Sequence, residues 1–328
     1  MNAVASLTGE LPQEEQARVD ADDAYRRLVA RLSHQSVVKH FDAYADVPWD
    51  DPEYAINPED PRFVLTSDDP LGATAWYQAQ PAAIQARIGL HMIATFARIG
   101  WQFESVLKRG LLEFALRLPE GAPEFRYVYH EVIEEAQHSL MFNEFVQRTG
   151  LPTKPPAILG IGDRAIVGFA RRFPELFFFF VLSGEDPIDY TQREMLKSDV
   201  PLHPLIERMS RIHVTEEARH IAFARHYLRR NVPKLGAFKL NLLRLRTAVT
   251  MRVAAGMMSR PSGHVVRTYN IPKEVLREAF GRGSLGVTYV KRALFKPREL
   301  AWELGVLNAR WAPLWKRLGI YAERGQME

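Results

Sequence analysis

The 328-residue sequence predicts an all-α fold, with a four-helix bundle at its core and additional helices packed around it. Apolar residues recur at the helical spacing of three and four positions through most of the chain. No run of useful length alternates polar and apolar residues as a half-buried strand would. Hydrophobic residues make up 47% of the sequence, enough for a sizeable core, and we expect a single domain over residues 1–328.

Two Glu-x-x-His motifs lie in the middle of the chain, Glu135 with His138 and Glu217 with His220. One turn of helix places residues i and i+3 on the same face, so each pair can offer a carboxylate oxygen and an imidazole nitrogen to one metal ion. Two such motifs, each preceded by a glutamate on another helix, are typical of ferritin-like di-iron bundles. With the upstream glutamates and a third histidine, the candidate metal ligands are Glu104, Glu135, His138, Glu185, His213, Glu217 and His220.

The third histidine extends the second motif, because His213, Glu217 and His220 are spaced i, i+4, i+7 and share one helix face. Carboxylates combined with imidazoles suit iron or manganese, whereas softer metals prefer sulfur. The chain has no Cys, which excludes disulfides, thiolate zinc sites, Cys-ligated iron–sulfur clusters and thiol nucleophiles. We therefore predict a centre of two iron ions, with manganese as the alternative metal.

Several other acidic residues lie close to these motifs in the sequence. Glu134, Glu144 and Glu216 are expected either to face solvent or to support the ligands. Glu131 shares the ligand face of its helix, and Asp189 is a candidate for orienting a ligand histidine.

Residues 1–72 are expected to form an N-terminal helix followed by an acidic extended arm. Apolar residues recur with the helical period within 12–40, whereas the prolines and aspartates of 44–72 break any helix. Residues 1–70 contain 15 Asp and Glu against six Lys and Arg. The sequence begins without a charged segment and an apolar stretch of the kind found in signal peptides, and we expect a cytoplasmic protein.

The metal-binding bundle is expected within residues 81–230. A helix should run from Pro81 to Leu118, because proline is favoured at the first turn and the apolar stripe is unbroken. Glu104 lies inside that stripe and needs a partner there. Ala97, Gly100 and Trp101 precede it by one or two turns, and we expect them to border room for a substrate or for dioxygen.

Three more helices are expected in the bundle region, at 123–148, 163–183 and 204–230. The run Phe177–Phe180 near the end of the second is apolar on every side and should be buried. Pro187 should kink or restart the chain beside Glu185, with irregular backbone there.

Residues 231–328 are expected to form basic helices around the bundle, at 235–258, 272–280 and 287–320. From Arg225 to Arg317 there are 20 Lys and Arg against four Asp and Glu. Such an excess suits an acidic carrier protein or a membrane surface, or it can pair with the acidic arm of the same chain. The aromatic spacing of a single-strand nucleic-acid groove is missing, and we expect no nucleic-acid binding.

Two glycine-rich stretches, residues 160–165 and 281–286, approach the pattern of a dinucleotide-binding loop. Neither follows a predicted strand, so we interpret both as turns between helices and expect no built-in nicotinamide or flavin site. Electrons must then come from an external donor.

In its metal-ligand pattern the chain resembles the p-aminobenzoate N-oxygenase (AurF-type) family of non-haem di-iron oxygenases, over roughly residues 40–230. The shared features are the order Glu, Glu-x-x-His, Glu, His-x-x-x-Glu-x-x-His and the acidic, proline-rich arm before the first ligand. The third histidine separates this family from acyl-carrier desaturases and ferritins. The resemblance implies that the seven candidate residues bind iron and that the protein oxygenates an amine nitrogen.

The expected function is therefore a di-iron monooxygenase that uses dioxygen to oxidise the nitrogen of a small arylamine. One alternative is hydroxylation or desaturation of an acyl chain, carried by an acidic protein docked on the basic C-terminal region. An alternative of another class is a ferritin-like protein that oxidises or stores metal. The room expected at Ala97 and Gly100, together with the third histidine, favours an oxygenase over storage. We also expect a homodimer.

Overall fold

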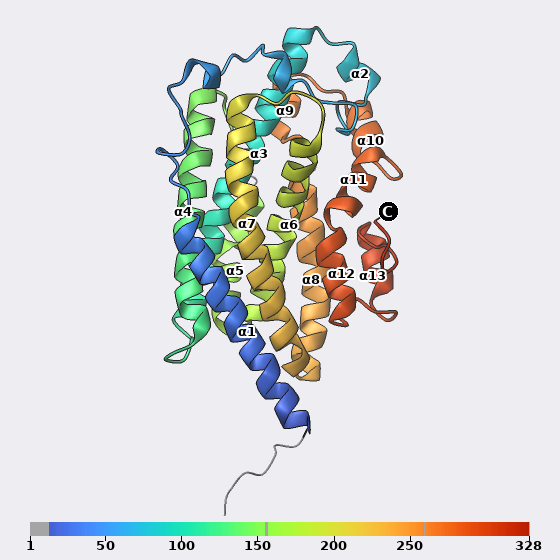
Figure 1. The fold of residues 1–328 in the computed structure, drawn as a ribbon. Coiled ribbons are helices and arrows are strands. Elements are labelled where there is room, and N and C mark those ends of the chain that lie inside the picture. The colour runs from blue at the N-terminus through green and yellow to red at the C-terminus, as the bar shows by residue number, and fades with distance from the viewer. Residues whose placement is uncertain (1–12, 155–156, 259, 328) are drawn as a thin grey trace, which may run out of the picture.

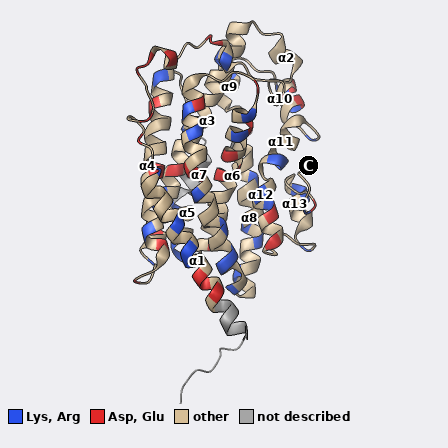
Figure 2. Cartoon of the chain, viewed as in Figure 1, with Lys and Arg blue, Asp and Glu red and all other residues tan. Residues whose placement is uncertain are grey.

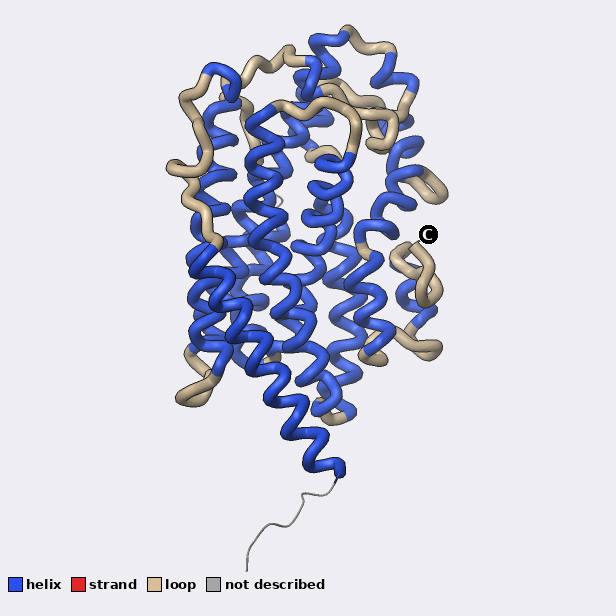
Figure 3. Tube along the Cα trace, viewed as in Figure 1, coloured by secondary structure: helices blue, strands red, loops and turns tan. Residues whose placement is uncertain are grey.

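The computed structural model of the protein describes residues 13–154, 157–258 and 260–327. Within these residues every regular element is a helix, and the prediction of an all-α fold is confirmed (Figures 1 and 3). None of the described helices combines the length and the apolar character needed to cross a lipid bilayer.

Four long helices form the bundle: α3 (Ala82–Ala115), α4 (Pro123–Thr149), α6 (Pro174–Lys197) and α7 (Pro204–Asn231). The most extensive packing joins α3 to α4 and α6 to α7. Proline opens three of these helices at the first turn, where its missing N–H has no intrahelical partner to lose. Gly150 ends α4 in the left-handed conformation, at φ 62°, which glycine adopts without steric cost.

Three helices cover the outside of this bundle. They are α1 (Gln13–Val38), α5 (Ala157–Arg172) and α8 (Ala237–Met258) (Figure 1). Helix α1 packs against α4, helix α5 packs against α3, and helix α8 packs against α6. The run Phe177–Phe180 on α6 is buried, as its apolar character predicts. The rings of Phe114, Phe178 and Tyr227 meet edge to face or tilted, so α3, α6 and α7 share one aromatic core.

The helix predicted at 163–183 is wrong in its boundaries. The chain breaks at Phe173 and restarts at Pro174, so α5 and α6 are separate helices. Pro187, where we expected irregular backbone, lies inside α6, which continues to Lys197. Residues 160–165, interpreted as a turn, lie within α5. Proline marks both positions, but at Pro187 the burial of the surrounding apolar residues outweighs the lost hydrogen bond.

The acidic arm crosses the end of the bundle through the short 3₁₀ turns Pro52–Tyr54 and Pro61–Phe63 and the four-residue helix α2 (Ala75–Gln78). Phe63 is buried and its ring stacks on His203 with centroids 4.8 Å apart. The Trp49 indole donates a 2.7 Å hydrogen bond to the Ala43 carbonyl, which anchors the arm.

The acidic residues of this segment form ion pairs mainly with bundle arginines rather than with the basic C-terminal region. Asp46 pairs with Arg208, Asp50 with Arg148, Glu59 with Arg87, and Asp22 with Arg230, while Asp60 pairs with Arg62 of the arm itself. Of these arginines, Arg230 alone belongs to the basic stretch counted above. Figure 2 shows both signs of charge interspersed over the bundle helices. The charges of the arm therefore do not pair mainly with the basic region. Its apolar residues do pack on that region, because Leu71 shares a buried cluster with Val265, Ile271 and Phe280.

The C-terminal region packs beside α6 and α8 in short helices rather than long ones (Figure 1). The single helix predicted at 287–320 is divided at Leu294 and at Gly305, which has φ 64°. A buried arginine, Arg298, donates to the carbonyls of Lys291 and Gln326 and holds the last turns together. The 3₁₀ turn Val232–Lys234 leads into α8. The helices after α8 are α9 (Gly263–Thr268), α10 (Lys273–Phe280), α11 (Leu285–Ala293), α12 (Phe295–Glu303) and α13 (Ala312–Leu318).

Candidate metal centre

The structure brings all seven candidate ligands into the interior of the bundle. Glu104 comes from α3, Glu135 and His138 from α4, and Glu185 from α6, while α7 supplies the other three. None of the seven is more than 1% exposed. Their ligand atoms fall into three overlapping groups, each within 4.8 Å: Glu104 with His138 and His213; Glu135 with Glu217 and His220; and Glu185 with His213 and Glu217.

Two carboxylates occupy the middle of the cluster. Glu135 places one oxygen 3.0 Å from Nδ1 of His220 and the other 3.8 Å from Nδ1 of His138. Oε1 of Glu217 lies 3.2 Å from Nδ1 of His220 and 3.5 Å from Nδ1 of His138. Each of these glutamates therefore lies between the two imidazoles and could share in holding a metal ion with either of them.

The remaining candidates lie around this pair. Nε2 of His213 is 3.6 Å from Oε1 of Glu217 and 3.8 Å from Oε1 of Glu104. The ring of His138 lies 4.6 Å from that of His213 and 6.0 Å from that of His220, so the imidazoles converge.

The hydrogen bonds of these side chains test whether the residues fit a metal. A buried polar atom without a partner destabilises the fold, and native proteins contain few of them. Among the described residues, partnerless buried atoms gather on the candidate ligands: Oε1 of Glu104, both oxygens of Glu135 and Glu185, Oε2 of Glu217, Nδ1 of His138, and both ring nitrogens of His213. Carboxylate oxygens and imidazole nitrogens are donors that iron and manganese accept, so the residues fit the predicted ions.

The opposite ring nitrogens of two histidines are held by carboxylates from the facing helix. Nε2 of His138 donates to Glu216 of α7 over 2.8 Å, and Nε2 of His220 donates to Glu134 of α4 over 2.7 Å. Arg219 donates to Glu134 at 2.7 Å and lies 3.5 Å from Glu216, so it connects the two carboxylates. These bonds direct each Nδ1 toward the interior of the cluster.

From sequence, Glu134 and Glu216 could either face solvent or support the ligands, and the structure gives them the second role. Both are buried, and each immediately precedes a ligand glutamate in the near-repeats Glu134–His138 and Glu216–His220. The repeated Glu-Glu-Ala-x-His pattern is the signal that marks them. Asp189, proposed for the same role, instead accepts from Arg193 at 2.7 Å.

The electrostatics of the cluster also call for cations. Burial, followed by the charges of Glu217, Glu135 and Glu104, holds the pKa of Glu185 well above its ordinary value. By contrast, burial raises the pKa of Glu134, but His220 and Arg219 outweigh it and lower this pKa to about 2. The raised pKa of Glu185 shows that the described side chains around it compensate its charge poorly, and a bound cation would supply that compensation.

Glu131, which shares the ligand face, takes no part in the three groups. It is 1% exposed, and burial raises its pKa to about 8.

Ser139 donates to Oε2 of Glu104 at 2.8 Å, and Lys108 donates both to Ser139 and, at 2.9 Å, to the Glu135 carbonyl. These bonds position Glu104 from the side facing solvent.

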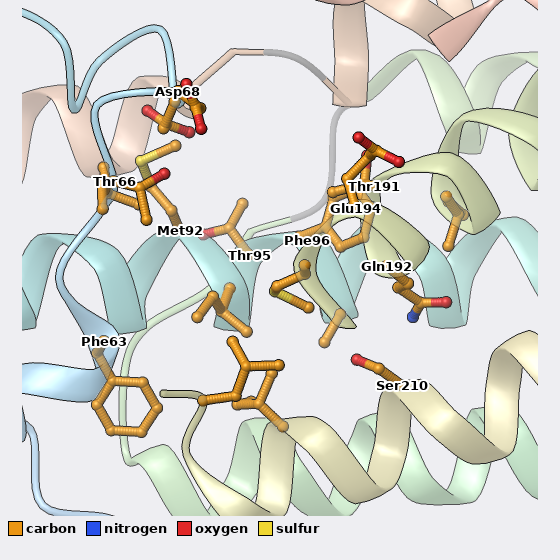
Figure 4. Close-up of a pocket in the computed structure, with 18 of the residues that line it drawn as sticks. Phe63, Thr66, Asp68, Met92, Thr95, Phe96, Thr191, Gln192, Glu194 and Ser210 are labelled. Carbon is orange, nitrogen blue, oxygen red and sulfur yellow. The ribbon is translucent and has the colours of Figure 1, made fainter. Parts of the chain in front are cut away.

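A cavity of about 650 Å³ opens beside the cluster, between α3, α6, α7, the arm and the C-terminal helices. Ala97 and Gly100 line it, as does Phe142, one turn beyond His138 (Figure 4 shows part of the lining). Trp101, which we expected at the same place, is not among the lining residues; the Arg98 guanidinium lies 3.9 Å from the centre of its ring.

Comparison with known proteins gives one family and several relatives. The sequence model of the family described as p-aminobenzoate N-oxygenase AurF matches residues 22–305. The chain is 38% identical over 299 residues to uncharacterized protein Rv0885 of Mycobacterium tuberculosis (strain ATCC 25618 / H37Rv), covering 90% of this chain and 88% of that protein. Uncharacterized protein Mb0909 of Mycobacterium bovis is similar to the same extent. No solved structure matches the chain significantly.

Proposed function

The chain belongs to the p-aminobenzoate N-oxygenase AurF family, and from this premise we propose that it is a di-iron N-oxygenase of aromatic amines. The family supports a di-iron oxygenase. The observation that carries the assignment to these residues is the buried cluster of partnerless carboxylate and imidazole atoms beside a cavity. We propose Glu104, Glu135, His138, Glu185, His213, Glu217 and His220 as the ligands of two iron ions.

The iron ions would supply the transfer of electrons to dioxygen. The protein's own contribution is to hold the ligand atoms in place, to exclude water and to position the substrate. Glu135 and Glu217, which lie between two imidazoles, would help to hold the ions, and the carboxylates of Glu134 and Glu216 hold those imidazoles in the orientation that ligation needs. None of the seven candidate ligands lines the cavity, but Phe142 does, and its ring lies 5.3 Å from that of His213. The amine would lie at this end of the cavity.

The proposed reaction converts an arylamine, dioxygen, two electrons and two protons into an arylhydroxylamine and water. One oxygen atom enters the new N–O bond and the other leaves as water. The two electrons come from an external donor, a reductase or a reduced small carrier, in a cytoplasmic setting. We retain the homodimer as a proposal.

A second candidate is oxidation of an acyl chain, favoured by the size and largely apolar lining of the cavity. Met92, Ile99, Ile188, Ile206 and Met209 all line it and offer the wall that an alkyl chain would need. An acidic carrier could bind to Lys291, Arg292 and Lys296 on α11 and α12. Arg292 and Lys296 are exposed, and Arg292 lines the cavity. A cavity of this size favours an enzyme that binds a substrate over a storage protein.

The test uses iron-loaded, chemically reduced protein exposed to dioxygen in a single turnover. We expect about two irons per chain and N-oxidation of an arylamine such as p-aminobenzoate or its amide, detected by mass spectrometry with an ¹⁸O label. Conversion of a carrier-bound acyl chain, with arylamines unchanged, would favour the second candidate. A protein that binds iron but oxidises neither class would contradict both.

A further inference from the structure

Two buried polar side chains on the cavity wall lack hydrogen-bond partners. Thr95 of α3 is 5% exposed and Gln192 of α6 is 6% exposed. Oγ1 of Thr95 and Oε1 of Gln192 have no partner among the described residues. Other polar groups of the same wall are satisfied: Thr191 donates to the Pro187 carbonyl at 2.9 Å, and His203 contacts the Ala55 carbonyl at 3.3 Å. A buried polar group that stays unpaired is unfavourable, so a ligand that bonded to it would gain affinity.

These two side chains lie at a defined distance from the proposed metal ligands. Gln192 follows Glu185 by seven residues, which puts both on one face of α6, roughly 10 Å apart along the axis. Thr95 precedes Glu104 by nine residues on α3, slightly farther out along that helix. The wall between is made of Gly100, Phe142 and Ile188 and is apolar. In a ligand whose reacting atom lies near the proposed metal site, the part next to that atom would contact apolar side chains. Only the part beyond it would reach the hydrogen-bonding groups of Gln192 and Thr95.

Figure 4 shows this arrangement from one side. The Gln192 amide and the Ser210 hydroxyl project from α6 and α7 into the space between them, and Thr95 projects from α3. Asp68 and Glu194 lie farther out in the same view.

Charge is confined to the outer part of the cavity. Asp68, Glu194, Arg260 and Arg292 line it and are exposed. The half-buried Asp69 also lines it, but its carboxylate accepts from the backbone N–H groups of Leu71 and Gly72. A carboxylate one ring away from the metals would therefore lie in an apolar section without a counter-charge, which is strongly unfavourable. A neutral group at the same depth avoids this cost and can bond to the amide and the hydroxyl.

Building on the proposed function, we infer that the substrate is a neutral, elongated arylamine whose carbonyl, amide or hydroxyl group bonds to Gln192 and Thr95. Its amine end lies against Gly100, Phe142 and Ile188, and its far end extends toward the charged rim. A cavity of about 650 Å³ is within the range that encloses drug-sized ligands and exceeds what one substituted ring requires. Gln192 and Thr95 are thereby specificity-determining residues, with p-aminobenzoate a poor ligand.

The test measures binding by calorimetry to iron-loaded, oxidised protein, without a reductant, so that turnover does not interfere. The probes are 4-aminobenzoate, 4-aminobenzamide and N-hexyl-4-aminobenzamide. The variants are Gln192→Leu and Thr95→Val. Matched controls are Gln102→Leu and Thr247→Val, because Oε1 of Gln102 and Oγ1 of Thr247 are also buried without a partner but neither residue lines the cavity. Iron content and thermal unfolding establish that each variant folds and retains metal.

We expect wild-type protein to bind 4-aminobenzamide at least about tenfold more tightly than 4-aminobenzoate, and the hexyl amide more tightly still. Gln192→Leu should weaken both amides by about tenfold and Thr95→Val by about threefold, the size of one neutral hydrogen bond each. The controls should leave both affinities unchanged.

The inference is overturned if 4-aminobenzoate binds as well as the amides, if none of the probes binds, or if the controls and cavity variants behave alike. N-oxidation is assayed separately. Oxidation of 4-aminobenzoate that ignores Gln192 would leave the proposed function standing and remove this inference. Amides that bind in a Gln192-dependent way but are never N-oxidised would support the pocket assignment and remove the N-oxygenase.

Discussion

Glu134 of α4 accepts a 2.7 Å hydrogen bond from Nε2 of His220 on α7, and this bond leaves Nδ1 of the imidazole directed at Glu135 and Glu217. The partner arrangement, Glu216 with His138, runs in the opposite direction between the same two helices. The orientation of each imidazole is thus fixed by the neighbouring helix rather than by its own. Metal affinity should then depend on residues that would not touch the metal.

Glu134→Gln should lower iron affinity by about 10- to 100-fold, because the amide is a weaker acceptor for the imidazole N–H and loses the ion pair with Arg219. Iron titration followed by the absorption of the centre measures this. Glu144→Gln is the control, since Glu144 lies on the same helix and pairs with Arg148 at the surface. Equal affinities for the two variants would show that Glu134 does not support the centre.

Local spacing predicts the candidate ligands well. Residues three positions apart must share a helix face whatever the helix packs against, so Glu135 and His138 could be paired from sequence. The partners of Nε2 could not, because the pairing of Glu134 with His220 depends on how α4 and α7 are packed. The sequence does not mark Thr95 and Gln192 for the same reason, since their burial beside a cavity depends on the packing of several helices together.

Helix boundaries show where local signals are ambiguous. Pro174 and Pro187 carry the same information in sequence, yet the first begins a helix and the second lies within one. The difference arises from packing: the α6 segment around Pro187 is buried on all sides, and interrupting it would expose apolar surface.

Glu185→Gln should change stability with opposite signs in the metal-free and iron-loaded protein. Burial and three neighbouring carboxylates hold the pKa of Glu185 above its ordinary value of 4.5, so the folded metal-free protein binds a proton more readily than the unfolded chain. The free energy of unfolding then falls as pH rises above that value. The glutamine variant removes this loss, and we expect metal-free Glu185→Gln to be more stable than wild type at pH 7.5.

With iron bound the order should reverse, because the variant lacks one ligand and gains less from metal binding. Urea unfolding at pH 5 and pH 7.5, with and without iron, measures all four cases. A metal-free variant that is no more stable than wild type at pH 7.5 would contradict the electrostatic account of the cluster.

Gly184→Ala should destabilise the protein by about 1–3 kcal/mol through overpacking. A Cβ at Gly184 would lie 2.3 Å from Cζ of the buried Phe103, which is one residue from Glu104. Gly168→Ala on α5 is the control: nothing lies within 4 Å of its Cβ, and alanine should stabilise this exposed helix position by roughly 0.5–1 kcal/mol. Urea unfolding measures both, and Phe103→Leu should partly restore the first variant. Equal effects of the two alanines would argue against the close approach of α3 and α6.

Arg225→Met should destabilise the protein more at pH 8 than at pH 5. Arg225 pairs with Asp186, a nearly fully buried carboxylate on α6 next to Glu185. Burial raises the pKa of Asp186 to about 6 although Arg225 acts to lower it, so removing the guanidinium should raise this pKa further. Above that pH the variant must either keep an uncompensated buried charge or bind a proton, at a cost of about 3 kcal/mol. Below it the carboxyl is already protonated, and the cost shrinks.

Adding Asp186→Asn should recover most of the loss at pH 8, because the amide carries no charge to compensate. Urea unfolding of the two single variants and the double variant at both pH values forms a thermodynamic cycle for the pair. A loss that is independent of pH, or that the second substitution leaves unchanged, would mean that Arg225 stabilises the fold through the packing of its aliphatic chain instead. In that case the ion pair would not be what holds α7 against the segment of α6 that carries Glu185.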